Sequence, residues 1–432
     1  MQQQKIASNR RSILFILFIG YTLANLDRFF INYAVLPMSE DLQLSASSTG
    51  LILSSFFLGY AIMQMPGGWL ADRFGARYTL VGCIIAWSIF TGLTAVAWSL
   101  SVLVAIRFVF GLGEGGFIPA SAKMINDSFP VKSRSRSMSI LMTAAAFAGV
   151  VTPIVATSMM VSIGWRQMFL IFGAVGVVVG ILFYKFLKPN LVPYEDDSAS
   201  PTNESAVNEG AQNVSVRQLF RTPMMWSLLI ASFAVYCINW GTASWLPTYL
   251  VQVRGLDLMS LGMLQMIPAA SSIVFVLLAG YLVDKVFAGR EKLLGMLCGA
   301  GLTLFVYLMF NAPNITLFVA YQSLLPIFTG TGIVLVTTLP MKKLPDAVGG
   351  SAVGMVQFGG QFAGFVAPLS IGFLVEAFSG SYTQVIYMLA GLGIVYVAAI
   401  ATLTFRKGAI FQSGGDADTP KVDQPAPGSV PV

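Results

Sequence analysis

The chain has 432 residues, of which 56% are hydrophobic and only 10% are charged. Soluble globular proteins carry about 25% charged residues, so this composition excludes a water-soluble multidomain enzyme. The net charge of +6 is not gathered into a basic face or an arginine-rich motif, which excludes a nucleic-acid binder.

The residue types that usually carry metal or acid–base chemistry are scarce. Histidine is absent from the sequence, which removes the usual metal ligand and the usual proton carrier near neutral pH. The three cysteines, Cys83, Cys237 and Cys298, lie far apart in apolar stretches, so they form neither a disulfide framework nor a metal-ligand spacing. We therefore expect no metal, no cofactor and no enzymatic activity, since no nucleophile–base pair can be assembled.

Long apolar runs recur along the chain. A membrane-spanning helix needs about 20 mostly apolar residues, and each of these runs is about that long. We expect an all-α membrane protein with twelve transmembrane helices. Their expected ranges are 13–36, 50–70, 78–98, 101–123, 138–160, 166–187, 224–250, 262–283, 292–310, 315–337, 349–374 and 384–405.

The lysines and arginines predict how these spans are oriented. Of the 25 basic residues, only Arg166 and Arg254 fall in loops on one expected side, and Arg28 and Arg107 fall within spans. Positively charged loops stay in the cytoplasm. We therefore expect a multi-pass protein with both termini in the cytoplasm. The expected location is a cell membrane, the inner membrane of a bacterium.

A polar segment divides the twelve spans into six and six. Residues 188–223 are acidic in the middle and poor in apolar residues, which predicts a disordered cytoplasmic linker. The expected units are an N-terminal six-helix bundle over 1–187, this linker over 188–223, a C-terminal six-helix bundle over 224–408 and a disordered cytoplasmic tail over 409–432.

A short motif occurs once in each half. Gly68–Arg73 (GWLADR) follows the second span, and Gly280–Lys285 (GYLVDK) follows the eighth. Parallel six-helix repeats around a central cavity are a known transporter design. The first copy continues through Gly75 to Arg77, and as a whole it resembles the signature between helices 2 and 3 of the major facilitator superfamily. That resemblance implies two pseudo-symmetric six-helix bundles, the major facilitator fold.

Three further stretches resemble the anion:cation symporter family, which includes sugar-acid and phthalate permeases. They are Asn25-Leu-Asp27-Arg28 in the first span, Arg107 to Glu114 with Pro119 in the fourth, and Gly164-Trp165-Arg166 before the sixth. The resemblance implies proton-coupled import of a small organic anion by alternating access. The expected partners are this anion, protons and the lipid bilayer, and nothing requires more than a monomer.

Two further expectations follow from the resemblance. Gly68, Asp72, Arg73 and Arg77 would make the contacts that hold the cytoplasmic side shut in the outward-open state. Sugar-acid members carry a polar residue in the middle of the fifth span, where this chain has Ala144–Ala146. That difference disfavours a heavily hydroxylated substrate.

Four ionisable residues, Asp27, Arg28, Arg107 and Glu114, fall deep within the expected spans. Each would cost about 2.5–3.5 kcal/mol or more at a helix centre in lipid, so these residues must pair with one another or line a wet cavity. Helical rise places Asp27 and Arg107 at a similar depth, with Glu114 on the face of Arg107 and about 10 Å closer to the cytoplasm.

This arrangement suits the transport of an anion with protons. An arginine fork matches a carboxylate or sulfonate and keeps its own proton, whereas a carboxylate that loses its arginine partner to a substrate takes up a proton. We expect Arg28 to hold the anion, Asp27 and Glu114 to carry protons, and Arg107 to switch between carboxylates. The alternative is a permanent Asp27–Arg107 or Arg107–Glu114 ion pair that fixes two helices.

No ionisable residue lies deep in a span of the C-terminal half, so any binding there must use neutral groups. The candidates are Asn239 and Trp240 in the seventh span, and Gln357 and Gln361 in the eleventh. Buried amides are costly unless they face a cavity or bond to a neighbouring helix, and both outcomes stay open. The resemblance also places Tyr60 and Gln64 of the second span near the substrate.

A rival interpretation is a proton-coupled exporter of drugs or metabolites from the same superfamily. Such exporters carry a Gly-Pro-rich signature in the fifth span, where this chain has only Gly149 and Pro153. A channel would show a repeated pore ring, and none is visible. The sequence therefore favours a symporter, and it leaves open whether the anion is a sugar acid, an aromatic acid or a sulfonated acid.

Overall fold

The computed structural model describes residues 2–187, 219–220, 222–344 and 346–403. Most of the expected linker and the whole expected tail lie outside the described residues. The helices are α1 (Gln2–Leu42), α2 (Ala46–Phe74), α3 (Ala76–Thr94), α4 (Leu100–Gly115), α5 (Phe117–Ser128), α6 (Val131–Ile163), α7 (Trp165–Phe186), α9 (Pro223–Gln252), α10 (Leu258–Tyr281), the π-helical turn η1 (Leu282–Val286), α11 (Glu291–Phe310), α12 (Ile315–Lys343), α13 (Asp346–Ala377) and α14 (Thr383–Ala401).

The predicted number of membrane spans is confirmed. Twelve of the described helical segments are long and apolar enough to cross a membrane. Two of them are composite: α4 and α5 together form the span Leu100–Ser128, and α10 with η1 forms Leu258–Val286. Several helices run past their apolar core, because hydropathy marks the depth of the bilayer and not the last helical hydrogen bond.

Glycine allows the backbones of α2 and α4 to touch where α4 gives way to α5. A Cβ atom on Gly67 would lie 2.5 Å from the Cα of Gly116, and one on Gly111 would lie 2.2 Å from the carbonyl oxygen of Phe56. Membrane helices pack most closely through such small residues. The close approach keeps the charged residues of α4 next to α1 and α2.

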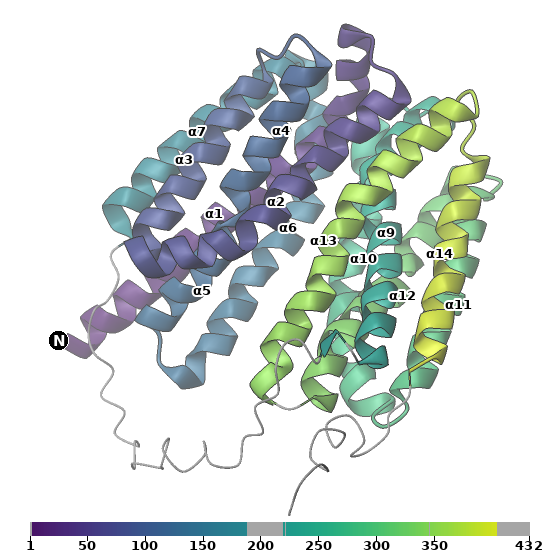
Figure 1. The fold of residues 1–432 in the computed structure, drawn as a ribbon. Helices are drawn as coiled ribbons and strands as arrows, with labels where there is room; N and C mark the ends of the chain where they lie inside the picture. Colours follow the sequence, from purple (N-terminus) through teal and green to yellow (C-terminus); the bar gives the residue numbers. More distant parts are fainter. Residues whose placement is uncertain (1, 188–218, 221, 345, 404–432) are drawn as a thin grey trace, which may run out of the picture.

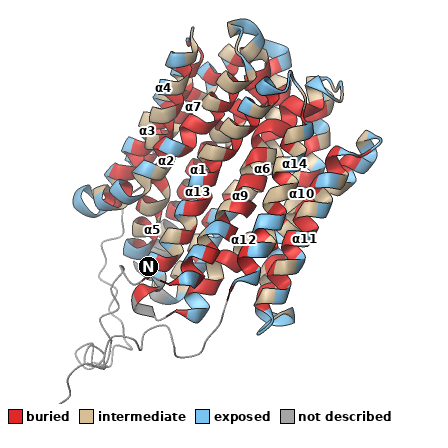
Figure 2. Ribbon diagram, turned by 45° about the vertical axis from the view of Figure 1, so that its right-hand side comes forward, coloured by how far each residue is buried: buried red, intermediate tan, exposed pale blue. Residues whose placement is uncertain are grey.

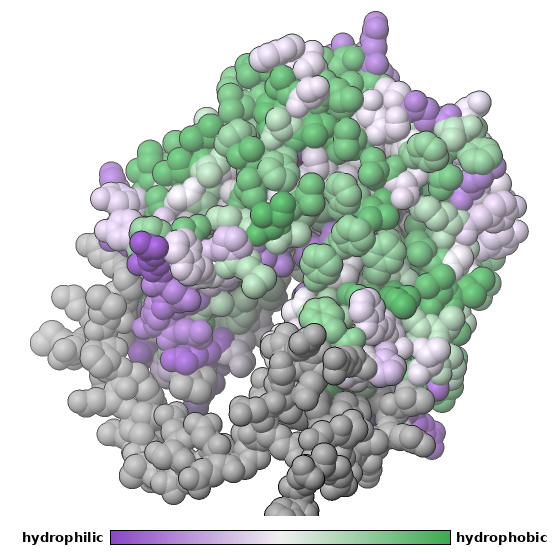
Figure 3. Space-filling model, in the orientation of Figure 1, coloured by the Kyte–Doolittle hydropathy of each residue, from purple (hydrophilic) through white to green (hydrophobic). Residues whose placement is uncertain are grey.

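The helices form two bundles that stand side by side, α1–α7 in purple to blue and α9–α14 in teal to yellow (Figure 1). Buried residues lie mainly on the faces that the helices turn toward one another (Figure 2). Large apolar side chains on the outward faces are exposed, among them Leu277 and Phe373, and hydrophobic residues cover much of the surface in Figure 3. Such a surface suits lipid.

The two bundles are packed tightly at one end, which we call the closed end and define by Gly50, Thr157, Gly262 and Gly372. A Cβ on Gly50 would lie 2.6 Å from the carbonyl oxygen of Pro368, and one on Gly262 would lie 2.1 Å from the Thr157 hydroxyl oxygen. These contacts join α2 to α13 and α6 to α10. The closed end therefore depends on glycine at the crossing points.

The opposite end, which we call the open end, is defined by Asp72, Lys123, Asp284 and Lys342. Its charged pairs stay within one bundle: Lys123 lies 3.4 Å from Asp72, and Lys342 lies 2.7 Å from Asp284. The motif repeated in the sequence thus places a carboxylate–lysine pair in each half. Figure 3 shows the molecular surface hollowed between the halves at this end.

Candidate functional site

A buried ion pair connects α1 and α4 inside the N-terminal bundle. Arg28 Nη2 donates a hydrogen bond to Glu114 Oε1, and the side chains of Arg28 and Glu114 are only 10% and 2% exposed. The Arg28 guanidinium carbon also lies 4.6 Å from the ring centre of Tyr60 and 5.0 Å from that of Phe56. Carboxylate and aromatic faces together compensate for burial of the arginine.

The other two intramembrane charges lie nearby without a direct ion pair between them. Asp27 is 1% exposed and accepts a hydrogen bond of 3.3 Å from the Thr91 hydroxyl. Arg107 is 2% exposed, and its guanidinium carbon lies 5.2 Å from the ring centre of Phe110. Asp27, Arg107 and Glu114 are close enough to interact electrostatically. With all four ionised, the cluster has no net formal charge.

Both arginines line one small pocket, which we call the cationic pocket. Its wall also includes Trp240 and Asn32, and its volume is about 10 Å³, enough for about one water molecule. Phe57 and Trp240 close it from the two bundles, with ring centres 4.9 Å apart.

Donors exceed acceptors around the cationic pocket. Among the described residues, Arg28 Nε, Arg107 Nε, Arg107 Nη2 and Trp240 Nε1 are buried and have no acceptor. Asp27 Oδ1 and Glu114 Oε2 also lack partners, but neither carboxylate lines this pocket. A buried donor without an acceptor costs about 1–3 kcal/mol, so these donors favour an anionic acceptor. A carboxylate is larger than one water molecule, so the pocket must widen to admit it.

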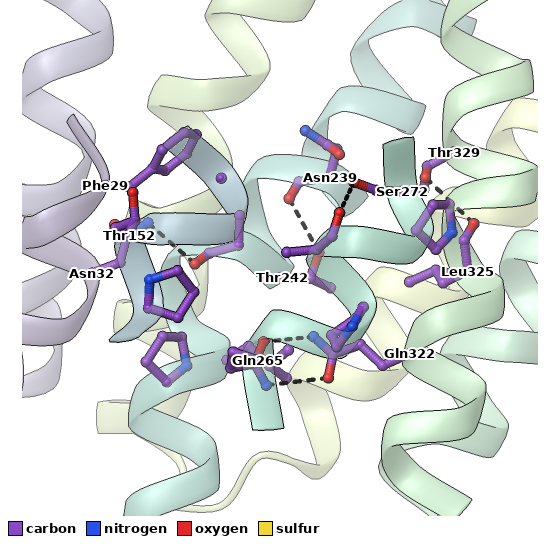
Figure 4. Close-up of a pocket in the computed structure, with 18 of the residues that line it drawn as sticks. Phe29, Asn32, Thr152, Asn239, Thr242, Gln265, Ser272, Gln322, Leu325 and Thr329 are labelled. Carbon is purple, nitrogen blue, oxygen red and sulfur yellow. Dashed lines mark hydrogen bonds between the residues drawn. The ribbon is translucent and has the colours of Figure 1, made fainter. Parts of the chain in front are cut away.

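A larger cavity of about 220 Å³, which we call the neutral cavity, adjoins the cationic pocket. The two share Phe29 and Asn32 in their walls, and Asn32 donates to the carbonyl oxygen of Ala243 across the bundles. None of the described residues that line the neutral cavity is charged. Figure 4 shows its polar groups, which come from α1, α6, α9, α10 and α12.

Two glutamines form a closed pair in the wall of the neutral cavity. Gln265 Nε2 donates to Gln322 Oε1 at 3.2 Å, and Gln322 Nε2 donates to Gln265 Oε1 at 2.8 Å (Figure 4). The pair joins α10 to α12. Each amide keeps one N–H and one lone pair for another partner.

The sequence matches the family model of the Major Facilitator Superfamily over residues 17–368. The chain belongs to this superfamily. Among solved structures, it is similar to a bacterial homologue of the human lysosomal transporter Spinster in an inward-facing and occupied conformation. The TM-score is 0.76 at 21% identity, and the match covers 91% of this chain and 95% of that one. At this identity the likeness shows the major facilitator fold alone.

Two curated relatives match nearly the whole chain. One is named probable sulfoacetate transporter SauU, from Cupriavidus necator, and is 32% identical over 91% of this chain and 93% of the relative. The other is named hexuronate transporter, from Bacillus subtilis, and is 26% identical over 96% of this chain and 99% of the relative.

The major facilitator fold brings together most of the predicted N-terminal site residues. Arg28, Glu114 and Tyr60 are in contact, and Asp27 and Arg107 lie within electrostatic reach. The ion pair differs from both pairs anticipated above, because Arg28 and not Arg107 bonds to Glu114. Arg28 follows Asp27 in α1, at a different expected depth from Glu114. The long side chain of Arg28 spans this difference.

Of the four predicted site residues of the C-terminal bundle, two line a cavity and two do not. Trp240 lines the cationic pocket and Asn239 lines the neutral cavity. Gln357 instead accepts a hydrogen bond of 3.1 Å from the Tyr236 hydroxyl. Gln361 and Gln64 are half-buried and line neither cavity.

The residues expected to gate the transporter all contact their own bundle. Asp72 is 73% exposed and faces Lys123. Arg73 lies over the ring of Trp69, and Arg77 donates to the carbonyl oxygen of Tyr184. Gly68 is half-buried next to Pro119. In this conformation these residues leave the open end unsealed.

Sequence reasoning missed Asn32, Thr152, Gln265 and Gln322 as cavity residues. Asn32 lies four positions after Arg28, so both lie on one face of α1. Gln265 and Gln322 are amides within apolar spans, the same signal that selected Gln357 and Gln361. Only the packing of α10 against α12 shows which amides reach the cavity.

Proposed function

We propose that this protein imports a small organic anion together with protons by alternating access. The two relatives described above support the anion, since one is named probable sulfoacetate transporter and the other hexuronate transporter. The observation that carries the proposal is the surplus of buried N–H donors around the cationic pocket, on Arg28, Arg107 and Trp240. A carboxylate or sulfonate supplies the acceptors that these donors lack.

Charge balance links the anion to protons. Arg28 is already bonded to Glu114, so an arriving anion competes with Glu114 for the same guanidinium. A carboxylate left buried without a cation costs several kcal/mol, and a proton on Glu114 removes that cost. The four ionised side chains have no net charge, so binding of a monoanionic substrate adds one negative charge to the cluster. Uptake of about one proton, on Glu114 or Asp27, therefore restores neutrality.

Arg107 has a separate role in this scheme. Two of its nitrogens lack acceptors, and it interacts electrostatically with both Asp27 and Glu114. It can therefore compensate whichever carboxylate is ionised. A guanidinium keeps its proton and is only weakly hydrated, and the rings of Phe110 and Phe169 flank that of Arg107.

The conformation supports alternating access with the open end toward the cytoplasm. Basic residues such as Lys123 and Lys342 gather at the open end, and positively charged loops stay in the cytoplasm. We propose the inner membrane of a bacterium as the location, with both termini in the cytoplasm.

To face outward, the transporter must break the glycine contacts of the closed end and join the two bundles around Asp72 and Arg77. A single chain supplies all of these groups, so we propose the monomer as the transport unit.

Uptake into proteoliposomes tests this function. The panel is D-galactonate, D-glucuronate, sulfoacetate, galactarate and phthalate, each with and without an inward proton gradient. We expect at least one acid to accumulate above its external concentration only when the gradient is present. Equilibration that ignores the gradient would refute proton coupling, and movement of lipophilic cations without any acid would support an exporter instead.

A further inference from the structure

The wall of the neutral cavity differs chemically from that of the cationic pocket. The side chains of Thr152, Thr242, Ser272 and Thr329 line it, and each hydroxyl donates its hydrogen to a carbonyl oxygen of its own helix. A hydroxyl keeps its acceptor lone pairs when its hydrogen is used. These four side chains therefore present acceptors to the cavity.

An uncharged wall that includes these hydroxyl acceptors favours a neutral polar group over an anion. A substrate hydroxyl donates to such oxygens, whereas a carboxylate or sulfonate has no hydrogen to give near neutral pH. A second anionic group in this cavity would meet no cation, because all the described lining residues are neutral. It would lose its hydration without compensation.

We infer that the neutral cavity holds the hydroxyl-bearing body of a monoanionic acid, and that Gln265 and Gln322 bind a hydroxyl at its far end. This inference rests on the proposed anion transport. The two compartments meet at Phe29 and Asn32, so one molecule can place its carboxylate among the arginines and its hydroxyls among the acceptors. The unpartnered donors of one compartment and the hydroxyl oxygens and amides of the other match the two ends of a hydroxy acid.

The Gln265–Gln322 pair is suited to this role because each amide carries both a donor and an acceptor. The pair bonds only to itself among the residues that the structure describes, and it leaves one N–H and one lone pair on each amide. A hydroxyl, which is also both donor and acceptor, can occupy both. Thr152 on α6 and residues of α9, α10 and α12 line the cavity with polar groups that Ala144–Ala146 lack. The inference therefore departs from the expectation, drawn from these alanines, that disfavours a heavily hydroxylated substrate.

Three acids with one carbon skeleton test the inference. D-Galactonate ends in a CH2OH group, D-fuconate (6-deoxy-D-galactonate) in a methyl group, and galactarate in a second carboxylate. We expect kcat/KM of proteoliposome uptake to be about tenfold higher for galactonate than for fuconate, the effect of one hydrogen bond to a buried polar group. We expect galactarate to be carried worst.

Variants separate substrate binding from helix packing. In Gln265→Leu and Gln322→Leu, the preference for galactonate over fuconate should fall toward unity, mainly through KM. Gln384→Leu is the control, because Gln384 is a half-buried glutamine of α14 that lines neither cavity, and its preference should equal that of the wild type. A pair that only joins α10 to α12 would lower Tm and the uptake of both acids equally.

Three outcomes overturn the inference. An unchanged galactonate preference in both leucine variants would assign the pair a packing role only. Uptake of galactarate as efficient as that of galactonate would show that the cavity accepts a second anion. Accumulation of sulfoacetate or phthalate without any of the three hydroxy acids would leave the proposed anion transport intact and refute the hydroxyl-binding wall alone, whereas no uptake of any acid would refute both.

Discussion

Arg28 of α1 donates a hydrogen bond to Glu114 of α4, and both side chains are at least nine-tenths buried. The pair lies beside the cationic pocket, whose buried N–H donors lack acceptors and favour binding of an anion. Because one guanidinium serves both Glu114 and the proposed substrate, occupancy by an anion and ionisation of Glu114 become alternatives. This competition is the physical basis for coupling.

The Glu114→Gln substitution should separate substrate exchange from accumulation. Glutamine keeps an acceptor for Arg28, but its amide neither gains nor loses a proton near neutral pH. We expect counterflow of labelled against unlabelled galactonate to persist, while accumulation driven by a proton gradient disappears.

The exposed residue Glu40 provides the control, since Glu40→Gln changes the same functional group outside the cluster. If the Arg28–Glu114 pair only fixes two helices, Glu114→Gln would instead lower Tm and reduce exchange and accumulation together. Breaking a buried pair costs about 3–5 kcal/mol, which a thermal unfolding measurement detects.

The Arg28→Lys substitution should weaken binding although it preserves the charge. Lysine lacks the planar fork that matches a carboxylate, and it loses the stacking of Arg28 on Tyr60 and Phe56. We expect KM to rise about tenfold, as for the loss of one charged hydrogen bond. Arg11→Lys, at an exposed position of α1, should leave KM unchanged. Equal KM values in both variants would contradict a substrate contact at Arg28.

The Trp240→Phe substitution removes one of the unpartnered donors and keeps the ring contact with Phe57. The indole N–H has no acceptor among the residues described, so we expect it to bond to the bound anion. Loss of a hydrogen bond to a charged group, about 1.5–3 kcal/mol, should raise KM at least about tenfold. Trp98→Phe, at a residue 73% exposed, serves as the control, and a KM that stays constant in both would exclude this contact.

The Gly372→Ala substitution should shift the transporter away from the conformation seen here. A Cβ on Gly372 would lie 2.4 Å from the carbonyl oxygen of Ala46, and such overpacking costs about 1–3 kcal/mol. The closed end would therefore open more often. A cysteine introduced at buried Thr49 reports this opening, because all three native cysteines are buried. It should react faster with an impermeant maleimide in the Gly372→Ala variant than in the parent protein.

Gly391→Ala on α14 is the matched control for this experiment, because a Cβ there would meet no atom within 4 Å. Labelling of the Thr49 position should then equal that in the parent protein. Equal rates in the Gly372 and Gly391 variants would show that the glycine crossing does not hold the closed end together.

The fold was predictable because the bilayer imposes a simple length rule on apolar runs. Twelve spans were expected, and the described part of the chain has twelve helical segments long and apolar enough to cross a membrane. The ends were less accurate: α1 continues to Leu42 and α12 to Lys343, beyond the last strongly apolar turn. Polar residues outside the membrane extend a helix without changing hydropathy inside it, so composition alone does not mark where a helix stops.

The charged half of the site was predictable for a similar reason. Ionisable residues are costly in lipid wherever they lie, so Asp27, Arg28, Arg107 and Glu114 are conspicuous in any apolar span. Their pairing was not predictable, because helical rise places Cα atoms and does not say where a long arginine side chain ends. Gln265 and Gln322 are 57 residues apart, and only the packing of α10 on α12 brings their amides together.

The most direct test of coupling is the number of protons that the purified protein takes up when it binds an anion. Galactonate, or the panel acid that shows the strongest uptake, is mixed with the protein in weakly buffered detergent solution while a pH indicator is followed. We expect about one proton per bound monoanion in the wild type and a smaller uptake in Glu114→Gln. Saturable binding of the acid with no proton uptake in the wild type would contradict coupling through the Arg28–Glu114 pair.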